Sequence, residues 1–191
     1  MTNLSDLFPA GAGKQVSFVA SGTLGNGVTV ALKTDGTVEA ISGATGSAGT
    51  PVVFETASTS EISATFDSDS NKVVIAYRDG GNSNYGTAIV GTVSGTAISF
   101  GTAVVFETAS TSNISATFDS DSNKVVIAYR DVGNSNYGTA IVGTVSGTSI
   151  SFGTAVVFET ATSGYMSATF DSNENKVVIA YRDGGNSNYG T

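Results

Sequence analysis

Several residue types that commonly build reaction centres are missing from this chain of 191 residues. It contains no histidine, no cysteine and no tryptophan. Without histidine the chain lacks the side chain that ordinarily titrates near neutral pH. Without cysteine it has no thiol nucleophile, no disulfide and no Cys/His zinc site. We therefore expect a protein that is not an enzyme and that holds neither a cofactor nor a metal.

Basic residues and long apolar runs are also scarce. Eight Lys and Arg stand against sixteen Asp and Glu, which gives a formal net charge of −8. A surface of that sign repels nucleic acid, and no basic cluster reverses it locally. No stretch approaches the roughly 20 apolar residues of a membrane span, and the start of the chain does not have the pattern of a signal peptide. We expect a protein made in a cytoplasm, without nucleic-acid partners or membrane insertion.

The most informative feature that is present is a repeat of 52 residues. Residues 51–102 and 103–154 align without a gap and are identical at 48 of 52 positions, and a third copy occupies residues 155–191. Repeats of this kind bury their apolar faces against their neighbours. Repeating a unit enlarges the surface or the length of a protein, whereas an active site is usually one unique arrangement of different side chains. The sequence therefore predicts a structural or binding protein, with a module at 1–45 and a β repeat domain at 46–191.

Each copy carries four strand signals separated by tight turns. In the first copy they are residues 62–66, 72–78, 85–93 and 97–107, the last of them kinked near Gly101. Val, Ile, Phe and Tyr fill the strands, while Gly, Ser, Asn and Asp fill the turns. Turns at intervals of about 8–12 residues predict an antiparallel all-β fold.

The strand at 72–78 is apolar on both of its faces. Val73, Ile75 and Tyr77 alternate with Val74 and Ala76, so the two sets point to opposite sides. Such a sheet must be covered on both sides, whereas a sandwich sheet keeps one polar face. Four-stranded units stacked in this way predict β-propeller-like blades, with a fibre-like β sandwich or a β-solenoid as alternatives. Three copies fall short of a closed ring of about four to eight blades, so we expect a homo-oligomer or a longer array.

Five segments carry a resemblance to a known class of proteins. Residues 4–14 read LSDLFPAGAGK, 18–24 FVASGTL and 30–38 VALKTDGTV, the last within a hairpin predicted over residues 27–41, and the repeat core reads KVVIAYRD at 72–79 and NSNYGTAIVGTVSG at 82–95. These segments resemble structural proteins of tailed phages of the marine and cyanobacterial type.

The resemblance implies a non-enzymatic virion protein that forms an exposed appendage, a tail fibre or a capsid decoration. The module at 1–45 would dock on other virion proteins, and the repeats would meet the host surface, where a glycan is a candidate partner. Such proteins carry no catalytic residues to transfer. The alternative is a carbohydrate-binding propeller lectin with one weak site in each repeat, whose affinity would grow by avidity.

Two recurring charged motifs invite a sharper interpretation. Asp67-x-Asp69-x-Asn71 has the spacing of calcium ligands but lacks the glycine and the distal glutamate of an EF-hand loop, so we interpret it as a turn. Arg78 followed by Asp79 recurs in every copy. Three arginines on three blades would resemble the carboxylate-binding cluster of sialidases, but the simpler expectation is an Arg–Asp pair that recurs in every blade, between blades or across a turn.

One position differs in all three copies while the strands stay constant. It carries Glu61, Asn113 and Tyr165, and Met166 stands beside the last of them in place of an isoleucine. A loop that varies on a constant scaffold is a usual place for recognition, although neutral drift at a tolerant loop gives the same pattern. These four residues are the candidate binding residues. Tyr165 is the strongest candidate because aromatic side chains dominate contact energetics.

Overall fold

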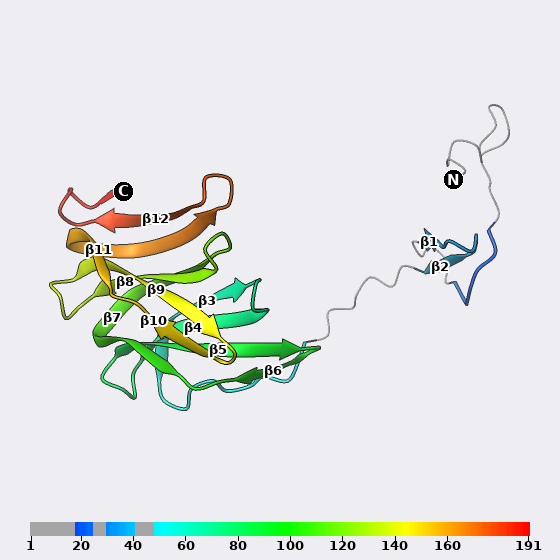
Figure 1. Ribbon diagram of the computed structural model, residues 1–191, viewed down its shortest axis with the longest axis horizontal. Helices are drawn as coiled ribbons and strands as arrows, with labels where there is room; N and C mark the ends of the chain where they lie inside the picture. Colours follow the sequence, from blue (N-terminus) through cyan, green and yellow to red (C-terminus); the bar gives the residue numbers. More distant parts are fainter. Residues whose placement is uncertain (1–17, 25–29, 41–47) are drawn as a thin grey trace. The chain divides into compact units, whose positions relative to one another are not determined.

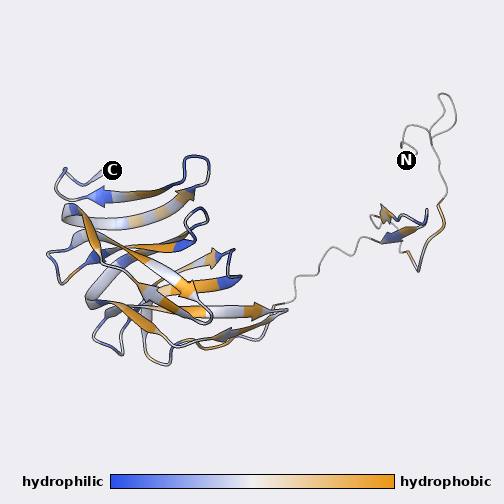
Figure 2. Cartoon of the chain, in the orientation of Figure 1, coloured by the Kyte–Doolittle hydropathy of each residue, from blue (hydrophilic) through white to orange (hydrophobic). Residues whose placement is uncertain are grey.

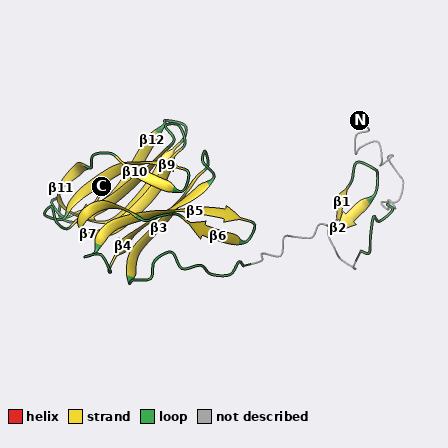
Figure 3. Cartoon of the chain, turned by 60° about the horizontal axis from the view of Figure 1, so that its bottom comes forward, coloured by secondary structure: helices red, strands yellow, loops and turns green. Residues whose placement is uncertain are grey.

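A computed structural model describes residues 18–24, 30–40 and 48–191 of the chain. The chain divides into two compact units, an N-terminal module (Met1–Ser47) and a repeat domain (Ala48–Thr191). Figures 1 and 3 show that the described residues form strands and turns without a helix, and every named strand pair is antiparallel. The all-β antiparallel class is therefore confirmed. No helix in the described residues is long and apolar enough to cross a membrane.

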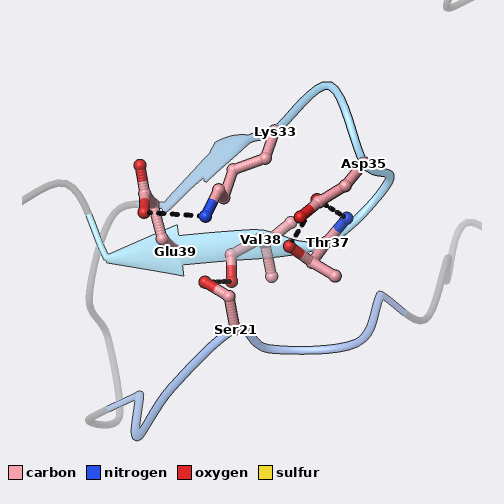
Figure 4. A network of polar contacts seen from close by, with 6 residues as sticks. All are labelled: Ser21, Lys33, Asp35, Thr37, Val38 and Glu39. Atoms are coloured by element: carbon pink, nitrogen blue, oxygen red, sulfur yellow. Dashed lines mark hydrogen bonds and ion pairs between the residues drawn. The ribbon is translucent and has the colours of Figure 1, made fainter.

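The N-terminal module contains the hairpin that the sequence predicts around residues 34–36. Gly36 sits in the turn with a φ of 81°, a value that glycine adopts without steric cost. The carboxylate of Asp35 accepts hydrogen bonds from the Thr37 hydroxyl at 2.6 Å and the Thr37 amide at 2.9 Å (Figure 4). These bonds, the hydroxyl bond first, lower the pKa of Asp35. The hairpin strands are β1 (Val30–Leu32) and β2 (Val38–Ala40).

Other sequence predictions in this module fall outside the described residues. They are the segment 4–14 and the outer parts of the predicted hairpin, residues 27–29 and 41. Within the described part, a lysine–glutamate ion pair of 3.6 Å joins the two arms of the hairpin (Lys33 and Glu39, Figure 4). The hydroxyl of Ser21 also donates to the carbonyl of Val38 at 3.3 Å. The module therefore ties an upstream segment to its hairpin through polar contacts.

The repeat domain contains eleven strands in one hydrogen-bonded sheet system. We refer to residues 51–102, 103–154 and 155–191 as repeats 1, 2 and 3. Repeat 1 holds β3 (Thr59–Asp67), β4 (Lys72–Asp79), β5 (Tyr85–Ser94) and β6 (Ala97–Phe100). Repeat 2 holds β7 (Val104–Asp119), β8 (Lys124–Asp131), β9 (Tyr137–Ser146) and β10 (Ser149–Phe152). Repeat 3 holds β11 (Val156–Asp171), β12 (Lys176–Asp183) and β13 (Tyr189–Gly190).

The strands β7 and β11 are unusually long because each of them joins two repeats. The first half of β7 pairs with β5, for example Val105 with Thr87, and the second half pairs with β8. Strand β11 does the same between β9 and β12. The strand predicted at 97–107 is thus divided. Its first part is β6, the chain then turns where the Gly101 amide donates to the carbonyl of Val90, and the rest belongs to β7.

The repeats cover one another, so that the middle repeat is buried from both sides. In repeat 1, Val74 and Ala76 are fully buried and belong to the same core cluster as Ile127 of repeat 2. In β8, residues of opposite faces, Ile127 and Ala128, are both fully buried. Figure 2 shows the apolar residues following the strands, while the turns between them are hydrophilic. The prediction of strands that need cover on both faces is confirmed.

Equivalent segments of neighbouring repeats lie beside one another in the stack, with contacts between residues 53 or 54 positions apart. The Ser63 hydroxyl of repeat 1 accepts a hydrogen bond from the Ala116 amide of repeat 2 at 3.0 Å. Ser115, the equivalent serine of repeat 2, accepts from Ala168 of repeat 3 at 2.9 Å. At the turns, the side-chain amide of Asn123 donates to the Asp69 carboxylate at 2.6 Å. Small differences between copies at one position can therefore combine into a single local environment.

Candidate binding site

The variable position lies inside strands and not in a loop. Glu61, Asn113 and Tyr165 occupy irregularities in the pairing of β3, β7 and β11, where the register shifts by a β-bulge. Their φ angles are 53°, 54° and 51°. A bulge leaves its extra residue without a partner in the ladder. The position can therefore change without altering the strands around it, and the expected loop location is wrong.

The three residues form a ladder across the stack. A carboxylate oxygen of Glu61 accepts a hydrogen bond from the Asn113 amide at 2.9 Å. The side-chain oxygen of Asn113 accepts in the same way from the amide of Tyr165. Each side chain thus satisfies the backbone of its own equivalent in the next repeat. Tyr165 ends this ladder in the described residues, and its side chain is 75% exposed.

The expected Arg–Asp pair is wrong. The Asp79 carboxylate accepts hydrogen bonds from the amides of Gly81 at 2.9 Å and Asn82 at 3.2 Å, so it closes the turn that follows β4. Adjacent residues of a strand point to opposite faces, which carries the Arg78 side chain away from this carboxylate. The described residues contain one ion pair, and it lies in the N-terminal module. The equivalent carboxylates bind turn amides as well (Asp131 and Asp183).

The recurring arginines lie opposite a serine in repeats 1 and 2 and opposite a glycine in repeat 3. Arg130 lies opposite Ser112, and its Nε donates to the serine hydroxyl at 2.8 Å. In repeat 3 the serine is replaced by Gly164, and the buried Nε of Arg182 has no hydrogen-bond partner among the described residues. The Arg182 guanidinium carbon lies 4.8 Å from the centroid of the Tyr165 ring, within the range of a cation–π interaction. The substitutions in repeat 3 therefore exchange a hydroxyl partner for an aromatic one.

These side chains converge on one pocket of about 360 Å³. All three repeats contribute to it, through β3, β7, β8, β11 and β12. The candidates Glu61, Asn113 and Tyr165 are brought together there, whereas Met166 is half-buried beside the pocket and does not line it. The sequence singled out the recurring arginines but assigned them to Asp pairs, so Arg130 and Arg182 were not among the candidate binding residues. The lining residues are Glu61, Asn113, Arg130, Gly164, Tyr165 and Arg182.

The Asp-x-Asp-x-Asn segments form turns, as the sequence predicts. The Asp67 side chain is almost fully buried, and its carboxylate accepts from the amides of Asp69 and Ser70 at 3.0 Å and from the Ser70 hydroxyl at 2.6 Å. Asp119 repeats this arrangement, and its bond from the Ser122 hydroxyl is the main cause of a lowered pKa. In the part of the chain that the structure describes, no group of three potential metal ligands comes together. The carboxylates of Asp67 and Asp119 accept hydrogen bonds that stabilise these turns.

A tyrosine–glutamate hydrogen bond recurs in each repeat and was not predicted. In repeat 2 the Tyr129 hydroxyl donates to the Glu107 carboxylate at 2.9 Å, and that carboxylate also accepts from the Ala109 amide at 3.1 Å. Burial, and then the charge of Glu107, raises the pKa of Tyr129 well above its usual value. The constant spacing of 22 residues between Glu and Tyr in every copy is the sequence signal of this bond. The equivalent pairs are Tyr77–Glu55 and Tyr181–Glu159.

Comparisons of this chain with protein-family models, with curated proteins and with solved structures find no match. The role of the pocket is therefore inferred from the residues of this chain alone.

Proposed function

We propose that this chain is a non-enzymatic structural protein of a bacteriophage virion, exposed as an appendage, a fibre or a capsid decoration. The resemblance of residues 4–14, 72–79 and 82–95 to tailed-phage proteins supports the virion assignment. The structural role is supported by one observation above the others. Nearly identical repeats are joined by strands that cross from one repeat into the next.

The crossing strands suit a protein that acts through its shape. Each repeat buries its apolar faces on its neighbours, and β7 and β11 continue the backbone hydrogen bonding from repeat to repeat. Stability in such an array comes from contacts between nearest neighbours. An additional copy can therefore lengthen the protein through the same contacts that join the existing repeats. This property favours a protein that presents an extended surface with a contact site.

We further propose that each repeat is a propeller-like blade. The order β3–β4–β5, with β6 and the first half of β7 beyond β5, gives a four-stranded antiparallel unit. Its chain then passes directly to the first strand of the next unit, as between blades. A ring would need further copies, supplied by a homo-oligomer or a longer array. A low-resolution electron-microscopy map tests this, because a ring supports blades and a filament supports the solenoid or fibre alternatives.

The N-terminal module would attach the protein to the particle. It is a compact unit separate from the repeats and does not share their sequence. A truncated chain of residues 49–191 should keep its β-type circular dichroism but fail to enter particles, while the full chain enters. If the truncated chain is incorporated as well as the full chain, the attachment role belongs elsewhere.

A specific observation also favours a binding role for the repeats. The pocket gathers an exposed aromatic ring, two guanidinium groups, an amide and a carboxylate from three repeats. A carbohydrate-binding protein of the lectin type is therefore the second candidate. In contrast to one weak site per repeat, the structure supports one composite site.

A further inference from the structure

We infer that this pocket binds an acidic saccharide, with the carboxylate of the sugar held by Arg130 and Arg182. The inference rests on the proposed function, because it names the ligand class of the surface that the repeats display. The argument has three parts: the charge of the pocket, the exposed ring of Tyr165, and the polar groups that Glu61 and Asn113 leave unused.

The pocket is locally positive on a protein that is strongly negative. Its lining has two cationic groups and one carboxylate, against a formal net charge of −8 for the chain. Neither Arg130 nor Arg182 forms an ion pair within the described residues. A guanidinium group offers parallel N–H donors that match the two oxygens of a carboxylate. Arg130 commits its Nε to Ser112, so its terminal nitrogens remain for a ligand.

Tyr165 provides a flat apolar surface beside these charges. Its ring is 75% exposed and rests against the Arg182 guanidinium. The negative face of an aromatic ring attracts the C–H groups of a sugar ring. The φ of 51° is in the left-handed region, where a bulky residue is strained and asparagine or glycine is comfortable. Because the exposed ring recovers little energy from burial, a strained aromatic residue here indicates a functional constraint.

Glu61 and Asn113 supply polar partners for hydroxyl groups. One carboxylate oxygen of Glu61 is occupied by the Asn113 amide, which leaves the other as an acceptor. The side-chain oxygen of Asn113 is occupied by the Tyr165 amide, which leaves its NH₂ group as a donor. The volume of about 360 Å³ is within the range of roughly 300–1,000 Å³ for ligand pockets. Hydroxyl partners, an aromatic face and paired guanidinium groups together describe a carboxylated sugar ring.

The test is a titration of the ¹⁵N-labelled full chain followed by NMR. The probes are D-glucuronate, D-glucose and acetate, and the reporters are the amide signals of Asn113, Gly164 and Tyr165. We expect saturable shifts with glucuronate, much weaker binding of acetate and none of glucose. Equal binding of glucose would show that the carboxylate of the ligand is not recognised. Equal binding of acetate would show that the sugar ring is not recognised. Absence of glucuronate binding would overturn the proposal as a whole.

Variants with a matched control separate recognition from folding. Arg182→Ala should weaken glucuronate binding by about tenfold or more, since hydrogen bonds to charged groups are among the strongest in proteins. Arg182→Lys keeps the positive charge but loses the two parallel N–H donors of the guanidinium group, so it should weaken binding as well. Arg78→Ala removes the equivalent arginine of repeat 1, which does not line the pocket, and should bind normally. If Arg78→Ala weakens binding as much as Arg182→Ala, the arginine acts on the fold and the proposal is wrong.

Tyr165→Asn provides a second control on stability. Asparagine stands at this position in repeat 2, adopts a positive φ readily and retains the backbone amide that Asn113 accepts from. We expect an unchanged or higher unfolding midpoint together with at least about tenfold weaker glucuronate binding, by analogy with the loss of a base–aromatic stacking contact. Normal glucuronate binding by this variant would show that the ring is not part of the site.

A separate measurement distinguishes failure of this inference from failure of the proposed function. Mass spectrometry of purified phage particles reports whether the chain is a virion component. If it is found there and glucuronate does not bind, the ligand class is wrong and the structural assignment stands. If glucuronate binds and the chain is absent from particles, the virion assignment is wrong and the pocket stands.

Discussion

Repeats 1 and 2 have nearly the same sequence but different surroundings. Phe66 of repeat 1 is 54% exposed, whereas its equivalent Phe118 is 9% exposed. Ile62 and Ile114 differ in the same way, at 54% and 8%. The middle repeat is covered on both sides, while the outward face of β3 has no neighbour within the described residues. The same side chain therefore contributes differently to stability according to its place in the stack, and paired substitutions can measure that difference.

The largest contrast is expected for the two phenylalanines. Phe118→Ala should reduce the free energy of unfolding by about 3–4 kcal/mol, because it leaves a cavity between packed repeats. Phe66→Ala removes a half-exposed ring and should cost about 1 kcal/mol or less. Urea unfolding of both variants measures the difference. Equal losses would mean that repeat 1 is covered by another molecule or that the repeats do not stack as described.

A second contrast concerns a glycine that lies against an aromatic ring in repeat 2 and against open space in repeat 3. A Cβ atom added at Gly138 would lie 2.6 Å from a ring carbon of Phe158 and 2.9 Å from the Ser163 hydroxyl, while a Cβ at Gly190 would have no neighbour within 4 Å. Gly138→Ala should therefore destabilise by about 1–3 kcal/mol through overpacking.

Gly190→Ala is the matched control for this prediction and should leave the unfolding midpoint nearly unchanged. Thermal unfolding followed by circular dichroism compares the two variants. A clear loss of stability in Gly190→Ala would contradict the open surroundings of β13.

The tyrosine–glutamate bonds predict a loss of stability at alkaline pH. An unfolded tyrosine has a pKa of about 10, and burial raises the pKa of Tyr129 in the folded protein. The stabilising effect is complete below pH 10 and is lost as the pH rises toward the folded pKa. Each such tyrosine contributes a slope of up to about 1.4 kcal/mol per pH unit.

The contribution of these bonds to the pH dependence of stability should be larger in repeat 2 than in repeat 3. Tyr129 is fully buried, whereas Tyr181 of repeat 3 is only partly covered. Tyr129→Phe should flatten the pH dependence between pH 10 and 11 more than Tyr181→Phe does. Unfolding in urea at several pH values checks this. An identical pH dependence in wild type and Tyr129→Phe would rule out a raised pKa at that residue.

The smallest effect is expected at the ladder that joins the bulges. Glu61→Ala removes the acceptor for the Asn113 amide and should cost about 0.5–1 kcal/mol, the net value of a typical hydrogen bond. Glu61→Gln keeps an acceptor oxygen and should be close to neutral. Hydrogen exchange of the Asn113 amide is the more direct measure, and it should accelerate in the alanine variant alone. Faster exchange in both variants would show that the carboxylate charge, and not the bond, protects the amide.

The all-β class and the two-faced strands could be predicted because they depend on local patterns. Alternating residues such as Val74 and Ile75 report which faces need cover, and Asp67 with its neighbours reports a turn. The crossing of β7 between repeats could not be predicted in this way, because the kink near Gly101 does not say whether the chain returns or continues. The register of one repeat on the next is a tertiary property.

The pocket forms only because of that register, so the sequence alone could not predict it. The sequence did identify Glu61, Asn113 and Tyr165 as one varying position, but it did not show that residues 52 apart are neighbours. The recurring arginines were expected to pair with Asp between blades or across a turn. Alternation of side chains along a strand excludes a pair between the neighbours Arg78 and Asp79, but the serine partner of Arg130 depends on the register of β7 on β8.

The crossing strands also have a mechanical consequence. A flexible linker between repeats would let each one swing and yield separately under load. Strand β7 instead has its two halves hydrogen-bonded to different repeats, and β11 does the same one repeat further along. A pulling or bending force on one repeat is therefore passed to the backbone ladder of its neighbour, and two repeats can move apart only when the ladder between β5 and β7, or that between β9 and β11, is broken.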